Sequence, residues 1–497
     1  MESSPSAMLK LLLPKTPFIF KTALAHTLRF SETSSKWDLR TELTIKVLRD
    51  MLGPSNRMTP ITKLQHLTTK DTGVKGTVWV SKVQLKTPEE DDVRQLLFKA
   101  IQDMGDGTEK WTKCDMHNVE GEWTGGRAGV SDTEPEPTGM SERDKYGKLM
   151  GEVKSKVTLL YFHGGAMYLL DPATYRHVTG KLARLTGGRV FSVRYRLAPQ
   201  NAFPAAILDA FMAYLSLLAP PPDAPHEPVP AAEIVFGGDS AGGLLCTSLL
   251  QLLLQIHRSH SGTGLPTVRW YGKDVEIPLP AGLALSSPWL DITRSLPSVE
   301  GLAKYDYLPP PSHTQGMNYP PDAAWPADPP RADLYCEGEA LKHPLVSPVA
   351  AKDWSNSPPT FFGLGEEMLR DEDAVLAKRM HQQGAVVRWR EFEAMPHCFA
   401  MMLDSLPASK TFFEEYAKFC SEVVDGKAAS SDGEKLLAKS LKREAVALDN
   451  VTQLTDEEIA KHMQEGQGLR KWYVCMARDH IIGIANPVYT RHAEALG

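Results

Sequence analysis

In this sequence, Ser240 is the residue whose surroundings best suit a nucleophile. Ser240 lies in GDSAG at 238–242, after an apolar run at 233–237 and before a helical run at 241–257. A serine on a sharp strand–turn–helix connection stands clear of the sheet, and glycine neighbours avoid collisions in so tight a turn. The N–H of Ala241 is then directed, at the positive end of the helix, toward an oxygen bound at the serine. A phosphate-binding loop has the same local pattern, so the other motifs decide between the two interpretations.

A glycine pair offers a second set of main-chain donors. It lies in HGGAMY at 163–168, directly after an apolar run at 157–162. A tetrahedral intermediate needs at least two N–H donors for its developing negative charge, and glycines let the main chain turn toward it. We expect His163 to hold this loop rather than to transfer protons. Asp239, beside the serine, is likewise expected to be a structural residue near the site.

A base and an acid follow the serine. His397 lies in MPHCF at 395–399, beyond the last expected strand, from where a loop can reach back to Ser240. Five acidic residues crowd positions 366–373, and one of them is expected to orient the imidazole. The order serine, acid, histidine is that of α/β-hydrolases. Cys398 is interpreted as a half-buried neighbour of the histidine and not as a catalytic thiol.

The elements that position these motifs alternate along the middle of the chain. Largely apolar strands separated by helices indicate a mostly parallel sheet covered by helices on both faces, an α/β fold. The expected strands are 157–162, 190–195, 233–237, 281–286, 359–364 and 386–392, and the expected helices are 173–186, 204–218, 241–257, 371–384 and 407–424.

The flanks divide the chain into three parts. We expect a helical cap or flap region with a first strand over 1–110, a catalytic domain over 111–424, and a linker with a tail over 425–497. Within the catalytic domain, the core spans 155–422, and the proline-rich insertion 300–345 is too long for an ordinary connection. Smaller expected features are a strand at 76–85, a helix at 88–103, a second strand at 115–124, a surface loop at 125–150 and a polar insertion at 258–280.

Composition excludes several classes of protein. The 497 residues carry a formal net charge of only -6, which does not suggest a nucleic-acid partner. The six cysteines have no metal-type spacing, so reduced thiols, no metal and a cytoplasmic location are expected. No apolar run reaches the roughly 18 residues of a membrane-spanning helix, and the N-terminus lacks a signal-peptide pattern. The mostly apolar stretch 18–28 is expected to pack on the core, to form a flap over the site, or to make a peripheral membrane contact.

Together, these motifs resemble those of the hormone-sensitive-lipase-like esterases, the α/β-hydrolase fold-3 group. The resemblance covers about residues 155–422, and the segments 1–70 and 425–497 resemble extensions of fungal members. It implies an α/β-hydrolase fold with a helical cap and cofactor-free hydrolysis of a hydrophobic carboxylic ester. The motifs that carry it are YFHGGAMY, YRLAPQNAFPAAILDA, GGDSAGG, HPLVSPV, GEEMLRDE and MPHCF.

The resemblance also implies roles for single residues. Ser240 matches the nucleophile, His397 the general base and Glu367 the triad acid, with Asp371 as the alternative acid. The family acid is usually aspartate, so the glutamate is a departure. The residues that match the oxyanion-hole donors are Gly165, Ala166 and Ala241.

Two further departures concern the pocket and its support. Ala166 replaces a glycine of the usual His-Gly-Gly-Gly, which keeps the N–H but adds a methyl group expected to narrow the acyl pocket. Gln200 replaces the glutamate that usually follows YRLAP. The insertion 300–345 is expected to form a lid wall, in which the aromatic residues either line an apolar pocket or pack the loop. These residues are Tyr305, Tyr307, Tyr319 and Trp325.

Two other functions fit the same scaffold. A non-hydrolytic small-molecule receptor is one, although such receptors tend to lose the base and His397 is present. A lyase, dehydratase or cyclase is the other, and the intact nucleophile and oxyanion loop argue against it.

Overall fold

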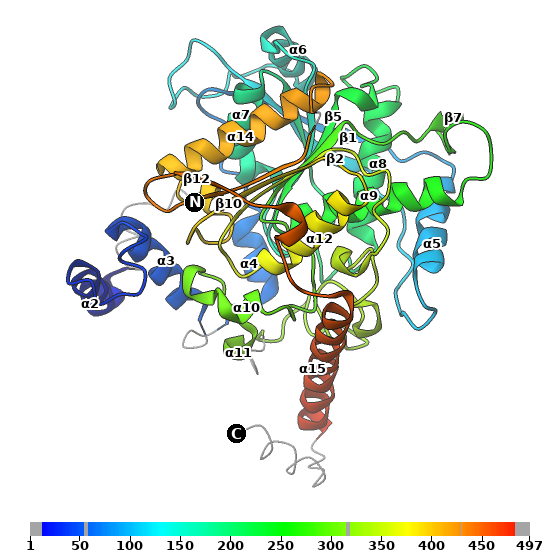
Figure 1. The fold of residues 1–497 in the computed structure, drawn as a ribbon. Coiled ribbons are helices and arrows are strands. Elements are labelled where there is room, and N and C mark those ends of the chain that lie inside the picture. The colour runs from blue at the N-terminus through cyan, green and yellow to red at the C-terminus, as the bar shows by residue number, and fades with distance from the viewer. Residues whose placement is uncertain (1–11, 54–57, 315–318, 429, 483–497) are drawn as a thin grey trace.

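A ten-stranded sheet forms the centre of the molecule (Figure 1), in the order β1-β2-β4-β3-β5-β8-β9-β10-β11-β12. The computed structural model describes residues 12–53, 58–314, 319–428 and 430–482. Neighbouring strands from β4 to β11 are parallel. The pairs β1–β2, β2–β4 and β11–β12 are antiparallel. The sheet is therefore mostly parallel, as its apolar strands predicted.

The bounds of the central strands β3, β4, β5, β8, β9 and β10 agree closely with the apolar runs of the sequence. The strands of the sheet are β1 (Val78–Leu85), β2 (Val119–Gly126), β3 (Thr158–Phe162), β4 (Arg189–Val193), β5 (Ile234–Asp239), β8 (Gly282–Ser286), β9 (Thr360–Gly365), β10 (Val387–Phe392), β11 (Asp432–Leu436) and β12 (Arg443–Ala445). A separate hairpin is formed by β6 (Thr267–Trp270) and β7 (Lys273–Glu276).

Helices cover both faces of the sheet, because successive strand residues point to opposite sides. In β3, Leu160 and Phe162 belong to one apolar cluster, and Leu159 and Tyr161 belong to the other. One face carries α8 (Ala205–Leu218), α9 (Ala241–Ser259) and α12 (Arg370–Gln382), and the other carries α7 (Pro172–Thr186), α13 (Phe399–Met402) and α14 (Pro407–Val424).

The N-terminal helices lie beside the carboxyl ends of the central strands. α3 (Leu39–Leu52) begins after Asp38, whose side chain accepts a hydrogen bond from Thr41 N at 2.7 Å. Just before it, the buried Trp37 indole donates to Ala394 O at 2.6 Å, which ties α3 to the loop that follows β10. α2 (Thr16–Thr27) packs on α3, and α4 (Ile61–Thr68) follows.

Other short elements complete the fold. The helix α5 (Asp92–Met104) packs on α8 and α9, away from α3 and α4. The remaining helices are α6 (Glu142–Glu152), α10 (Ser298–Gly301), α11 (Pro311–Thr314) and α15 (Asp456–Ile482), and the 3-10 turns are η1 (Leu13–Lys15), η2 (Ala231–Glu233), η3 (Ala303–Tyr305), η4 (Gly338–Ala340), η5 (Pro348–Ala350) and η6 (Leu448–Asn450). Among the helices within the described ranges, none combines the length and apolar content required to cross a membrane.

Two segments differ from what their composition predicts. The expected loop 125–150 contains the start of α6, which Ser141 caps by accepting a hydrogen bond from Asp144 N at 3.1 Å. The expected linker after residue 424 contains β11 and β12, which extend the main sheet. Although β11 is polar, an ion pair helps to fix it to the sheet, since Arg390 of β10 lies 2.6 Å from Asp432. A reading of apolar periodicity cannot detect such a strand.

Candidate active site

Ser240 stands at the turn from β5 into α9 with a strained backbone. Its φ is 51°, a conformation that non-glycine residues seldom adopt. The turn is fixed on both sides, since Ser240 N donates to Ser286 O at 3.0 Å and Trp289 N donates to Ser240 O at 2.9 Å. A Cβ on Gly242 would lie 1.9 Å from Phe162 O, so only glycine fits there. The sequence motif therefore reflects a backbone requirement.

The structure brings Ser240, His397 and Glu367 together. His397 Nε2 lies 2.9 Å from Ser240 Oγ, and His397 Nδ1 lies 3.1 Å from Glu367 Oε2. His397 and Glu367 are buried, with 3% and 0% of their surface exposed. The loop that carries the histidine is held by Cys398 N, which donates to Ser287 Oγ at 3.2 Å. This arrangement has the geometry of a hydroxyl, a base and an orienting acid.

Burial shapes the ionisation of these groups. Burial raises the pKa of Glu367, and the nearby His397 imidazole opposes that rise. Burial also disfavours the charged form of His397, but the adjacent Cys398 and the Glu367 carboxylate favour it, so that the pKa of His397 lies well above its usual range. Burial raises the pKa of the Cys398 thiol to about 12, although its Sγ lies 3.5 Å from His397 Nε2. A thiol with so high a pKa is a poor nucleophile at neutral pH.

The alternative acid faces elsewhere. Asp371 Oδ2 accepts a hydrogen bond from Ser298 N at 2.9 Å, and Ser298 Oγ accepts one from Asp371 N at 3.0 Å. Asp371 therefore anchors the start of α10. Glu366, which precedes Glu367, accepts from Ala394 N at 3.0 Å and supports the loop before the histidine. Of the acids in 366–373, it is Glu367 that lies within hydrogen-bonding distance of the imidazole.

The loop after β3 presents main-chain donors beside the serine. Gly165 has φ +106° and Ala166 has φ 52°, and a Cβ on Gly165 would lie 2.2 Å from Leu169 O. Gly164 N is already used, because it donates to Asp239 Oδ1 at 3.2 Å. Within the described ranges, the N–H groups of Gly165 and Ala166 donate to no acceptor. These donors, together with that of Ala241, have the character expected of an oxyanion hole.

His163 and Asp239 hold this loop in place. His163 Nδ1 lies 2.7 Å from Gly164 O, and its ring stacks on Tyr195 with centroids 4.4 Å apart. Burial lowers the pKa of His163 to about 4, so the ring is neutral and Nδ1–H donates to that carbonyl. Asp239 accepts a hydrogen bond from Tyr175 Oη at 2.8 Å. Both residues support the loop and neither contacts Ser240 Oγ through a hydrogen bond.

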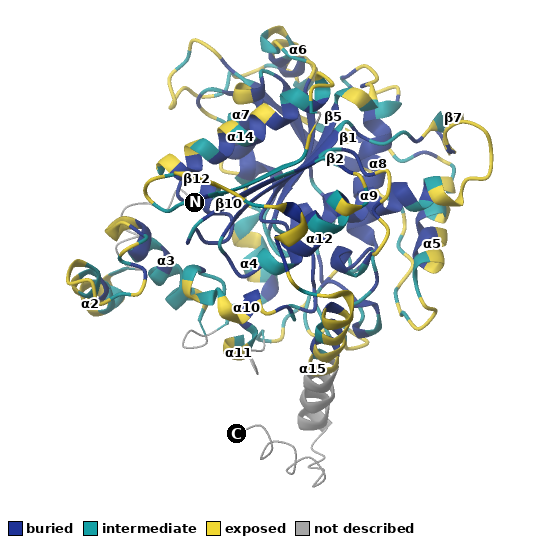
Figure 2. Ribbon diagram, viewed as in Figure 1, coloured by how far each residue is buried: buried dark blue, intermediate teal, exposed yellow. Residues whose placement is uncertain are grey.

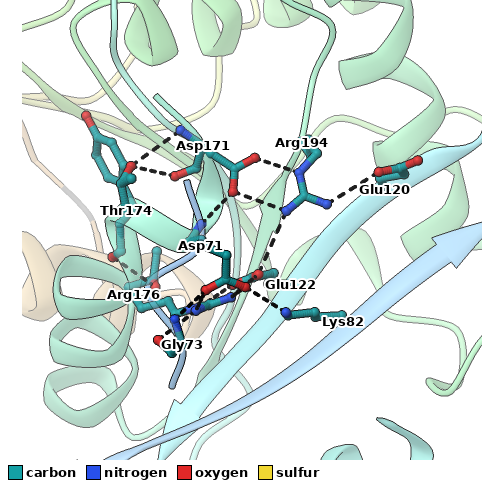
Figure 3. Close-up of polar contacts among 12 residues, drawn as sticks. Asp71, Gly73, Lys82, Glu120, Glu122, Asp171, Thr174, Arg176 and Arg194 are labelled. Carbon is teal, nitrogen blue, oxygen red and sulfur yellow. Dashed lines mark hydrogen bonds and ion pairs between the residues drawn. The ribbon is translucent and has the colours of Figure 1, made fainter. Parts of the chain in front are cut away.

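A network of ion pairs fixes the far end of the loop (Figure 3). Asp171 caps α7 by accepting from Ala173 N at 2.9 Å, and its carboxylate pairs with Arg194 at 2.6 Å. Arg176 of α7 pairs with Glu122 of β2 at 2.5 Å and with Asp71 at 2.6 Å. The network thus joins the N-terminal region, β2 and α7. Sequence reasoning missed it, because the partners lie far apart along the chain.

Gln65 of α4 is a second residue that the sequence did not reveal. Its Nε2 donates to Ala198 O at 2.9 Å and to Tyr168 O at 3.1 Å, and its Oε1 accepts from Gln200 Nε2 at 2.8 Å. The glutamine at position 200, in place of the usual glutamate, was the one sign of this contact in the sequence, since its amide N–H can donate to the amide oxygen of Gln65. Gln65 therefore anchors the oxyanion loop to the N-terminal region.

The proline-rich insertion contributes aromatic side chains to the site. The Tyr307 ring lies 6.2 Å from the His397 ring, and Tyr319 Oη lies 2.7 Å from Tyr168 Oη. Tyr305 instead packs against Trp37, with ring centroids 6.3 Å apart. The insertion thus both faces the site and packs against the N-terminal helices. In the described part of the chain, no cluster of side chains is suited to hold a metal ion.

The comparisons with known proteins agree with this fold. A family model described as an alpha/beta hydrolase fold matches residues 159–401. An acetyl-hydrolase of Streptomyces hygroscopicus is 29% identical over 263 residues, which are 53% of this chain and 74% of that protein. An esterase of Acinetobacter venetianus is 26% identical over 279 residues, which are 55% of this chain and 78% of that protein.

The solved structures give the same fold. A crystal structure of a hormone-sensitive lipase from a metagenome library superimposes with a TM-score of 0.51 at 24% identity, covering 78% of this chain and 99% of that one. At this identity the likeness concerns the fold. The motifs, the sheet and these matches together show that the chain has the α/β-hydrolase fold and that it is similar to the hormone-sensitive-lipase-like esterases.

Proposed function

We propose that this carboxylesterase-like hydrolase cleaves a hydrophobic ester through a triad of Ser240, His397 and Glu367. The observation that carries the proposal is the continuous chain of contacts Oγ–Nε2 and Nδ1–Oε2, at 2.9 Å and 3.1 Å. A hydroxyl, an imidazole and a carboxylate in this order form an activated nucleophile. The strained turn at Ser240 and the unpaired N–H groups beside it support the same assignment.

The mechanism follows from these groups. His397 accepts the proton of Ser240 as Oγ attacks the ester carbonyl carbon, and the Glu367 carboxylate stabilises the imidazolium that forms. The N–H groups of Gly165, Ala166 and Ala241 bind the oxyanion, each contributing about 3 kcal/mol to transition-state stabilisation. His397 then protonates the leaving alcohol. Water, activated by the same imidazole, attacks the acyl-enzyme and releases the acid, and no cofactor is required.

Several features favour a short acyl group on a large apolar alcohol. The methyl group of Ala166 lies on the oxyanion loop, where it takes space that a glycine would leave to the acyl chain. Aromatic rings of Tyr307 and Tyr168 offer an apolar surface for the alcohol. The similarity to an acetyl-hydrolase agrees with a small acyl group. The five described cysteines are free thiols, which agrees with the cytoplasmic location that we propose.

A series of p-nitrophenyl esters of increasing acyl length tests this function. We expect the highest kcat/KM for the acetyl and butyryl esters and a fall for longer chains. The Ser240→Ala variant, which keeps the fold, should lose at least about 10⁴-fold in kcat. A folded native protein that turns over none of these esters would favour the receptor or lyase alternatives.

A further inference from the structure

The helix α2 has an unusual distribution of side chains. A surface helix normally turns its apolar face to the protein and its polar face to water. In α2, Thr22 is 5% exposed and the side chain of His26 is 14% exposed, on the side that packs on α3. Two of its large apolar side chains, those of Phe20 and Leu24, are exposed, whereas Phe18 and Ile19 are half-buried. The exposed apolar residues of α2 and of the segments just before and after it, which we call the α2 ridge, are Leu13 (65%), Phe20 (69%), Leu24 (49%), Leu28 (52%) and Phe30 (81%).

Polar contacts fix this orientation of α2. Lys15, at the start of the helix, pairs with Asp50 of α3, and His26 pairs with Glu42 of α3. Phe20, Leu24 and Leu28 recur every four residues, so they form one stripe along the outer side. Figure 2 shows α2 at the periphery of the molecule, with exposed residues on its outer side. The ridge is therefore held outward by the packing on α3.

The charged side chains within the segment that carries the ridge are basic. Between residues 13 and 31 the sequence contains no aspartate or glutamate. Lys21 and Arg29 are exposed and form no ion pair with any residue in the described ranges. An apolar stripe flanked by unpaired cations matches a membrane surface that contains anionic lipid, because apolar residues enter the acyl boundary while cations meet the headgroups.

The ridge is connected to the proposed catalytic groups. Arg49, on the α3 helix beneath it, donates from Nε to Asp306 O at 2.7 Å. The Asp306 carboxylate accepts from Met368 N at 3.2 Å, directly after Glu367, and Tyr307 faces His397. A lipid surface bound by the α2 ridge would therefore lie next to the elements that border the proposed catalytic site.

We propose that the α2 ridge docks the protein on an anionic lipid surface, from which it takes hydrophobic esters dissolved in that surface. The proposal rests on the proposed function for the nature of the substrate, while the docking itself is independent of catalysis. It is also distinct from membrane insertion, since α2 lies on the surface and does not cross it.

Flotation of the full chain with vesicles tests the docking. The vesicles contain phosphatidylcholine alone or an equimolar mixture with phosphatidylserine. We expect native protein and Ser240→Ala to float with the mixed vesicles. The combined change Phe20→Ser, Leu24→Ser and Leu28→Ser should weaken this binding about a hundredfold. The matched control, Leu185→Ser with Leu265→Ser, removes apolar side chains that are also exposed but lie outside α2, and should leave binding unchanged.

A second variant covers the case in which the triple serine variant fails to fold. Lys21→Glu with Arg29→Glu keeps the ridge and should lose about tenfold or more in affinity for the mixed vesicles, with little effect on phosphatidylcholine alone. Absence of native binding, or binding that survives both sets of changes, overturns the proposal. A dimer in analytical ultracentrifugation that dissociates in the triple variant also overturns it, because a second copy would then cover the ridge. Vesicle binding by a protein that hydrolyses no ester would refute the proposed function and leave the docking intact.

Discussion

Replacing Glu367 by glutamine separates an ionic role of this side chain from a structural one. Glutamine keeps the size of the side chain and can still accept a hydrogen bond from His397 Nδ1, now 3.1 Å from Glu367 Oε2. What it loses is the negative charge that stabilises the imidazolium in a fully buried position. Loss of a neutral hydrogen bond alone would cost about 1 kcal/mol, or less than tenfold in rate. Loss of a triad carboxylate costs about 10⁴-fold in kcat, or about 5 kcal/mol.

The assay is kcat for p-nitrophenyl acetate, with Asp371→Asn as the matched control. The asparagine can still accept the hydrogen bond from Ser298 N, so we expect kcat within about threefold of native and a loss of stability of at most about 1 kcal/mol. Glu367→Gln should lose about 10⁴-fold in kcat, with little change in KM. A loss of that size in Asp371→Asn, with Glu367→Gln close to native, would refute the assignment of the acid.

Four other predictions follow from single residues. Because the pKa of His397 is raised, kcat/KM should increase with pH through an apparent pKa above 6.5, and Glu367→Gln should lower that apparent pKa. A native kcat/KM that stays constant down to pH 5 would contradict the raised pKa. Ala166→Gly should remove the backbone strain of a positive φ and stabilise the fold by about 1 kcal/mol in urea unfolding. The same change should raise the kcat/KM of longer acyl esters relative to shorter ones. Equal acyl specificity in both proteins would count against a narrowed pocket. Gln65→Ala should lower kcat about tenfold without abolishing fluorophosphonate labelling, since it frees the oxyanion loop from α4, whereas unchanged kcat would remove it from a positioning role. Burial lowers the pKa of His226 to about 4, so protonation favours the unfolded chain, and about 3 kcal/mol of stability should be lost as pH falls from 6.5 to 4. The His226→Gln variant should lose less stability over this pH range. An identical pH dependence of unfolding in both proteins would exclude His226 as the cause.

The sequence predicted the central strands and the chemical groups for a physical reason. A strand covered on both faces must be apolar, so runs such as 157–162 and 233–237 are visible in the sequence. A sharp turn with no room for side chains requires glycine, which made the surroundings of Ser240 conspicuous. The roles of single residues remain predictions, although the structure brings Ser240, His397 and Glu367 together in the expected order.

What escaped prediction depends on contacts between distant segments. The polar strand β11 is fixed by the ion pair between Arg390 and Asp432, and Gln65 is recognisable only once α4 lies against the oxyanion loop. Neither contact leaves an apolar periodicity. For the stretch 18–28, the sequence left packing on the core, a flap and a membrane contact open, because an apolar run does not say which of its faces is buried.

The most direct test of the account is intact-protein and peptide mass spectrometry after reaction with a fluorophosphonate. The account predicts a single adduct on Ser240, formed in native protein and absent in Ser240→Ala. An adduct on Cys398 or elsewhere, or no adduct on a protein that unfolds cooperatively on heating, would contradict it.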